Sequence, residues 1–114
     1  MCSNPYRQVF SADELQSIVE AAHSHDKPVL AHCRCTAAVN QALDAGVDTI
    51  LHCFFYDADG TYRFDEATAD RLAKSETWLN PTMHISRASQ TALRQIKKDR
   101  GLDAEQQERL DRSI

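Results

Sequence analysis

Two short apolar runs that each end in a histidine most constrain the fold of this chain. They are Pro28–His32 and Asp48–His52, and the segment Thr36–Gly46 between them has the apolar spacing of a helix with a terminal glycine. A strand–helix–strand unit of this length sets its two strands side by side and parallel. We therefore predict that His32 and His52 lie on neighbouring strands at the carboxyl edge of a sheet, where α/β proteins bind ligands.

The rest of the chain continues this alternation of helices and strands. Ser11 with Glu14 forms a capping box, and Asp65 can cap a later helix. The order of the elements predicts one α/β domain over residues 1–114, with about three parallel strands alternating with helices. We expect an irregular lead-in over 1–10, helices over Ala12–Ser24, Glu66–Lys74, Ser86–Arg100 and Asp103–Ile114, a third strand over Thr77–Met83, and a helical C-terminal tail over 86–114.

Composition excludes several classes of protein. The net charge is −4 and no basic face precedes the last third of the chain, so we expect no nucleic-acid partner. No apolar run approaches the ~20 residues of a membrane span, and the N-terminus has no basic-then-apolar signal, so we expect a soluble, cytoplasmic protein without a membrane partner. The four cysteines do not form the pattern of a disulfide framework and are expected to be reduced thiols.

Several motifs, taken in order, resemble the amidohydrolase superfamily, and in particular its imidazolonepropionase and Xaa-Pro dipeptidase (prolidase)-like metal-dependent hydrolases. The resemblance covers about Phe10 to Ser86. It is carried by Phe10-Ser-x-x-Glu-Leu15, Val19-Glu-Ala-Ala-His23, Pro28-Val-Leu-Ala-His32, Ala42-Leu-Asp-Ala-Gly-Val-Asp-Thr-Ile-Leu-His52 and Asn80-Pro-Thr82.

This resemblance implies a fold and a metal site. The family has a (β/α)8 barrel with one or two divalent metals, usually zinc, at the carboxyl ends of the strands. By the resemblance, His32 and His52 are the metal ligands that end the fifth and sixth strands, and Asn80-Pro-Thr82 marks the seventh. The family's other ligands, and the aspartate that acts as general base, lie on strands for which this chain has no counterpart. The resemblance therefore implies a partial (β/α)8 barrel without a complete active site of its own.

The resemblance leaves two hypotheses for the function. In the first, the chain is part of a metal-dependent amidohydrolase that cleaves an amide-type C–N bond in a dipeptide or cyclic amide through metal-activated water. In the second, the chain is a non-catalytic truncated barrel segment that acts as an oligomeric or metal-binding module. Because three strands cannot close a barrel, we expect a homo-oligomer, held through the strand edges or through an inner face that carries Leu30, Ile50 and Leu79.

Other candidate ligands surround the two histidines. His32, Cys35, His52 and Cys53 include the ligand types of a tetrahedral zinc site, although strand alternation points Cys53, like Cys33, to the opposite face. Cys35, together with Tyr56 and His84, is a candidate for the edge of the site or for substrate contact.

Two further motifs are better explained by structural roles. His23-Ser-His25 imitates a metal-binding pair, but it precedes the first strand and is expected to be a surface turn at the other end of the sheet. Asp57-Ala-Asp-Gly60 begins like a calcium loop but lacks the later ligands, so we expect a plain turn.

Overall fold

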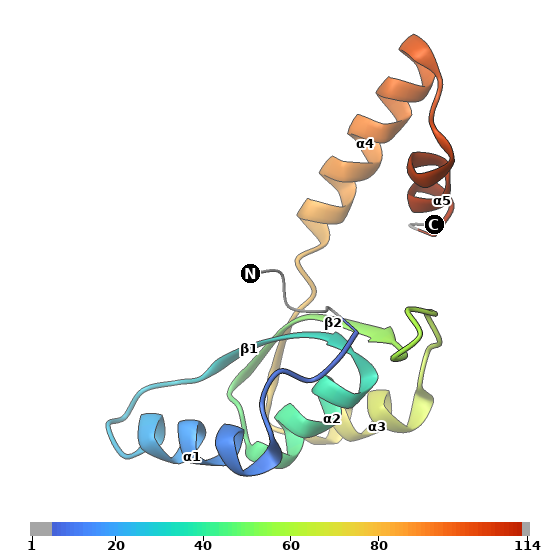
Figure 1. Cartoon of the computed structure of the whole chain (residues 1–114). Coiled ribbons are helices and arrows are strands. Elements are labelled where there is room, and N and C mark those ends of the chain that lie inside the picture. The colour runs from blue at the N-terminus through green and yellow to red at the C-terminus, as the bar shows by residue number, and fades with distance from the viewer. Residues whose placement is uncertain (1–5, 113–114) are drawn as a thin grey trace. The chain divides into compact units, whose positions relative to one another are not determined.

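The computed structural model describes residues 6–112, apart from the side chains of Ile85, Ser86, Asp99 and Arg112. It comprises two compact units that divide between Pro81 and Thr82, which we name the sheet unit and the helical unit. The sheet unit contains α1 (Ala12–His23), β1 (Leu30–Cys35), α2 (Thr36–Ala45), β2 (Thr49–Tyr56), α3 (Glu66–Lys74) and β3 (Trp78–Asn80), and the helical unit contains α4 (Met83–Arg100) and α5 (Ala104–Arg112) (Figure 1).

The three strands form one parallel sheet in the order β1-β2-β3. Leu30 is aligned with Thr49, and His32 with Leu51. On the other side of β2, Ile50 is aligned with Leu79. Three parallel strands alternating with helices confirm the predicted partial-barrel architecture.

The helices α1, α2 and α3 cover one face of the sheet (Figure 1). The α2 stripe of Val39, Ala42 and Ala45 packs there against Ile50 of β2 and Val19 of α1. Ile50 and Val39 have no exposed surface, and burying one such side chain contributes about 1.5–3 kcal/mol. We call this side of the sheet the covered face, and the other side the open face.

Caps and polar contacts fix where the helices begin and end. The predicted capping box is present: the Glu14 amide donates to Ser11 Oγ at 3.2 Å, and the Ser11 amide donates to Glu14 Oε2 at 2.8 Å. Gly46 ends α2 with φ +75°, a left-handed conformation that glycine adopts without a steric penalty. Asp65 caps α3 by accepting from the Thr68 amide at 2.9 Å.

The strand boundaries differ from those expected. β1 and β2 continue past His32 and His52, so neither histidine ends its strand. The run after His52 is rich in aromatic residues, which favour strands, and it stays in the sheet as far as Tyr56. β3 is only three residues long, because Pro81 has no amide hydrogen to extend the ladder.

The helical unit is a pair of helices whose apolar residues include the buried Leu93 of α4 and Leu110 of α5. α4 starts at Met83, three residues earlier than expected. Asp103 precedes α5 and accepts from the Gln106 amide at 2.8 Å. Ile114, the other predicted apolar anchor of this helix, lies outside the described residues. No helix in residues 6–112 has the length and apolar character needed to cross a membrane.

Candidate metal site

The imidazole rings of His32 and His52 face each other on the sheet. Nδ1 of His32 lies 2.9 Å from Nε2 of His52, and the ring centroids are 5.0 Å apart at an interplanar angle of 44°. This separation agrees with the expectation that neighbouring parallel strands bring the two side chains together. At 2.9 Å the two nitrogens are within hydrogen-bond distance of each other.

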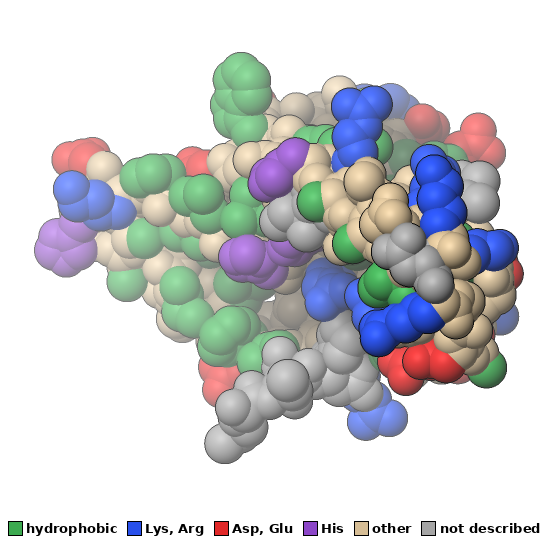
Figure 2. All heavy atoms as spheres, turned by 90° about the horizontal axis from the view of Figure 1, so that it is seen from above, with side chains coloured by type: hydrophobic (Ala, Val, Ile, Leu, Met, Phe, Trp, Pro, Cys, Tyr) green, Lys and Arg blue, Asp and Glu red, His purple; other side chains and the backbone are tan. Residues whose placement is uncertain are grey.

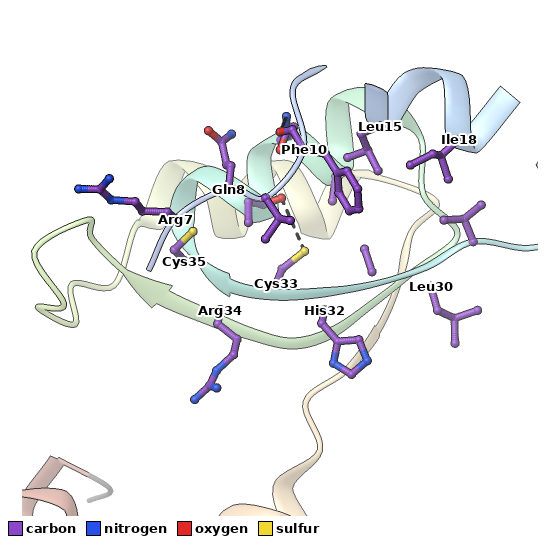
Figure 3. A pocket seen from close by; sticks show the side chains of 16 residues that line it. Arg7, Gln8, Phe10, Leu15, Ile18, Leu30, His32, Cys33, Arg34 and Cys35 are labelled. Carbon is purple, nitrogen blue, oxygen red and sulfur yellow. Dashed lines mark hydrogen bonds between the residues drawn. The ribbon is translucent and has the colours of Figure 1, made fainter. Parts of the chain in front are cut away.

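Strand alternation along β1 places His32 on the open face. Leu30, His32 and Arg34 are exposed, with Leu30 at 56%, whereas Cys33 and Cys35 are 2% and 1% exposed. Figure 3 shows the first three side chains pointing away from the helices, and the two cysteines pointing toward them. The open face corresponds to the predicted inner face, and Leu30 lies there as expected. Ile50 and its register partner Leu79 lie on the covered face instead, so the prediction was wrong for these two residues.

A break in the alternation of β2 brings His52 to the same face as His32. Because Ile50 faces the helices, regular alternation would turn His52 toward them as well. Instead, His52 and Cys53 have φ of +73° and +54°, and the register between β1 and β2 shifts between Cys33 and Cys35. Two consecutive left-handed residues reorient the strand locally, as in a β-bulge. Such conformations cost about 1–3 kcal/mol each and are concentrated at functional sites.

The surroundings of His52 favour its neutral form. Burial lowers the pKa of His52, and the neighbouring His32 and Arg34 lower it further. Neutral imidazole is the form that binds metal ions. His52 therefore offers a neutral nitrogen donor on the open face.

Aromatic rings continue from His52 along β2. The His52 and Phe54 rings are stacked with centroids 6.0 Å apart, and Phe54 contacts Tyr56 edge-on at 6.0 Å. The Arg34 guanidinium lies over Phe54, 6.0 Å from its centroid. Tyr56, a predicted site-edge residue, belongs to this row, and it also contacts Tyr62. In Figure 2, which views the molecule from above, hydrophobic side chains gather beside histidines.

The cysteines are not arranged as ligands next to the histidine pair. Cys33 and Cys35 are buried on the covered face, and Cys53 packs against the same core. Burial, with smaller contributions from Cys53 and Cys35, raises the pKa of Cys33 to about 12, and burial also raises that of Cys53. A cysteine binds zinc as the thiolate, so the raised pKa values oppose metal binding by these two thiols. The predicted position of Cys35 at the site edge is therefore wrong.

The other predicted residues have separate positions. His23 Nε2 lies 2.9 Å from Oδ2 of Asp48, the residue just before β2. His23 is therefore at the end of the sheet opposite to the candidate site, as expected. Asp57 pairs with Arg63 and forms a turn closed at Gly60, as expected for a plain turn. His84 is an exposed residue of α4 in the helical unit, and its contact with the site stays a prediction.

The geometry of the pair is compatible with part of a metal site. Zinc–nitrogen bonds of 2.0–2.1 Å at tetrahedral angles set two ligand nitrogens about 3.4 Å apart, so the rings would separate by about half an ångström. Within residues 6–112, no group of three or more His, Cys, Asp or Glu side chains is arranged to hold a metal ion. The pair thus supplies two donors, fewer than the three protein ligands of a typical catalytic zinc.

Sequence reasoning missed the positive-φ pair that orients His52. Left-handed backbone is usually signalled by glycine or asparagine, and neither stands at these positions. It also missed the proximity of Arg34 to the site, since that depends on the continuation of β1 beyond His32.

Comparison with solved structures identifies similar folds. The crystal structure of A. niger ochratoxinase is 22% identical over 97% of this chain and 22% of that chain, with a TM-score of 0.73. A prolidase complexed with N-methylphosphonate-L-proline is 25% identical over 91% of this chain and 22% of that one, with a TM-score of 0.60. An amidohydrolase is 26% identical over 91% of this chain and 26% of that one, with a TM-score of 0.58.

Neither family models nor curated proteins match the chain. The chain spans about a quarter or less of the length of the three solved structures. Its parallel strands, covering helices and structural neighbours confirm the resemblance that the sequence motifs suggested. The chain is therefore similar in fold to part of the barrel of amidohydrolase-superfamily enzymes.

Proposed function

We propose that His32 and His52 are metal ligands of an amidohydrolase active site that hydrolyses an amide-type C–N bond. The observation that carries the proposal is the 2.9 Å approach of two imidazole nitrogens on the open face. The backbone departs from regular strand geometry at His52, which supports a functional reason for this arrangement. The remaining ligands and the general base would come from strands outside the three described here.

The metal is a divalent cation, with zinc as the best candidate because imidazole is among its preferred ligands. Such a metal activates water at neutral pH and polarises a carbonyl group. The two histidines would hold the metal. Phe54 and Tyr56 would form an apolar wall along the substrate, since their rings continue the row that begins at His52.

A small peptide-like amide is the proposed substrate class. The similar prolidase is complexed with N-methylphosphonate-L-proline, and a similar Xaa-Pro dipeptidase has methionine bound in its active site. The name of the second is that of a dipeptide-cleaving enzyme. A dipeptide or a cyclic amide would fit beside the aromatic row of β2.

A second candidate function is metal binding without catalysis. It is favoured by the finding that residues 6–112 contain no third side chain arranged with the histidine pair to hold a metal ion. In that case the chain would bind zinc but would not cleave amides.

Isothermal titration calorimetry with zinc tests the proposal. The wild-type chain should bind one zinc ion, and His32→Ala or His52→Ala should each weaken binding by at least about tenfold, because each removes one of two donors. His25→Ala is the matched control, since His25 lies in the exposed turn after α1. Unchanged binding in both site variants would refute the proposal. If both site variants lose zinc binding, an assay for release of proline from an Xaa-Pro dipeptide distinguishes the hydrolase from the non-catalytic metal-binding module.

A further inference from the structure

His52 carries its imidazole on backbone that leaves regular strand geometry, so the orientation of the ring depends on the side chains around it. The residue has φ +73°, and the last torsion angle of a histidine side chain has broad energy minima. A histidine that binds a metal ion needs one fixed ring orientation, which groups outside the ligand set usually provide. The side chains that pack against His52 therefore bear on how well the histidine pair can hold a metal ion.

Phe54 packs against the His52 ring. Its aromatic ring is stacked on the imidazole at an interplanar angle of 24°, with the two centroids 6.0 Å apart. Stacked aromatic rings at this separation attract each other beyond the effect of the buried area. The attraction depends on the angle between the rings, so the stack restrains rotation of the imidazole about its side-chain bonds.

Two further side chains hold the Phe54 ring itself. The Arg34 guanidinium of β1 lies 6.0 Å from the centroid of the Phe54 ring, which is within the range of a cation–π contact. Tyr56 contacts Phe54 edge-on at an angle of 83°, with centroids 6.0 Å apart. Arg34 forms no ion pair in the part of the chain that the structure describes, so its guanidinium is available to the aromatic ring.

The two histidines, Arg34 and Phe54 form one cluster across two strands. Arg34 follows His32 by two residues in β1, and Figure 3 shows both side chains pointing to the same side of the strand. Phe54 follows His52 by two residues in β2. Each strand therefore contributes one candidate ligand and one residue that supports it. All of these contacts lie between the neighbouring strands β1 and β2, or within β2.

We propose that Phe54 is a positioning residue that orients the His52 imidazole toward His32, with Arg34 holding the Phe54 ring. A phenyl ring supplies no nitrogen, oxygen or sulfur ligand, so Phe54 acts on a metal ion only through His52. The expected effect on zinc affinity rests on the proposed function, whereas the orientation of the His52 ring is measured without metal. Loss of the stack frees the His52 ring to rotate away from His32.

Two substitutions at Phe54 separate the aromatic stack from the filling of space by an apolar side chain. Phe54→Leu keeps an apolar side chain but removes the ring, whereas Phe54→Tyr retains the ring and should behave like the wild-type chain. Phe55→Leu is the matched control, because it makes the same change one residue further along β2, where the ring contacts Tyr62 and Phe64. None of these substitutions changes the charge of the site, and circular dichroism confirms that each variant is folded.

The nuclear Overhauser effect between the ring protons of His32 and His52 measures the orientation without metal, since the ring centroids are 5.0 Å apart. The effect should be present in the wild-type chain, in Phe54→Tyr and in Phe55→Leu, and it should be reduced in Phe54→Leu. The proposal is overturned if Phe54→Leu retains the wild-type intensity. It is also overturned if Phe54→Tyr loses as much intensity as Phe54→Leu, because the aromatic ring would then not be the cause.

Isothermal titration calorimetry with zinc measures the consequence for the metal site. Phe54→Leu should bind zinc about two- to tenfold more weakly than the wild-type chain, and Phe54→Tyr and Phe55→Leu should bind it equally well. Equal zinc affinity of Phe54→Leu and the wild-type chain also overturns the proposal. A wild-type chain that binds no zinc refutes the proposed function instead, and the contact between the two histidine rings still decides whether Phe54 positions His52.

Discussion

Replacing Cys53 with glycine should stabilise the sheet unit relative to replacing it with alanine. In an ordinary strand, glycine is about 0.5–1 kcal/mol less stable than alanine. Cys53 has φ +54°, however, and a left-handed conformation costs a residue with a Cβ about 1–2 kcal/mol. The second effect exceeds the first, so Cys53→Gly should be more stable than Cys53→Ala by roughly 0.5–1 kcal/mol.

Comparing the two variants with each other removes the contribution of the thiol, which both have lost. Cys33 provides the matched control, because it is a buried thiol in β1 whose φ is not positive. At this position glycine should be less stable than alanine by about 1 kcal/mol. The expected signs of the two comparisons are therefore opposite.

Urea unfolding monitored by circular dichroism measures these differences through the midpoint and the m-value. A difference of this size corresponds to a shift of about 3–6 °C in melting temperature for a domain of this length. If Cys53→Gly were less stable than Cys53→Ala, as expected at Cys33, the backbone at Cys53 would not be left-handed. The account of how His52 reaches the open face would then fail.

Three further predictions concern stability and thiol chemistry. The His23 contact and the Val29 amide lower the pKa of Asp48, so the stability that Asp48 contributes is present above about pH 4 and is lost as the pH falls through its lowered pKa. In urea unfolding measured from pH 6 to 2.5, Asp48→Asn should therefore lose less stability with falling pH than the wild-type chain. An equal pH dependence of the two urea midpoints would contradict this. Arg71→Met removes the 2.6 Å ion pair with Asp44 and the hydrogen bond that Arg71 donates to Asn40 Oδ1, and it should cost about 0.5–1 kcal/mol in urea unfolding. Lys74→Met should cost nothing measurable, and equal effects would argue against these two contacts. Because the pKa of Cys33 is about 12, its thiol should not react with a disulfide reagent at pH 8 until the protein is unfolded, and rapid labelling found by mass spectrometry would contradict the burial.

The element order and the helix boundaries could be predicted because they depend on local signals. The Ser11–Glu14 capping box, the glycine after α2 and the periodic apolar residues of α2 each act within a few residues along the chain. The parallel pairing followed from the short helix between two apolar runs. These signals were sufficient to bring His32 and His52 onto neighbouring strands.

The faces of the sheet could not be predicted in the same way. Alternation assigns every strand residue to a face only while the backbone stays regular, and it fails at the left-handed pair of His52 and Cys53. The assignment of Ile50 to the inner face was therefore wrong, although the approach of the two histidines was predicted. Cys35 was misplaced because β1 continues past His32 and keeps its alternation.

Histidine nuclear magnetic resonance of the chain titrated with zinc tests the central claim most directly. The chain has five histidines, and the structure brings Nδ1 of His32 and Nε2 of His52 to face each other. We predict that zinc shifts the nitrogen resonances of these two atoms, while those of His23 and His25 stay unchanged. A shift confined to other histidines, or no shift at stoichiometric zinc, would contradict the assignment of His32 and His52 as metal ligands.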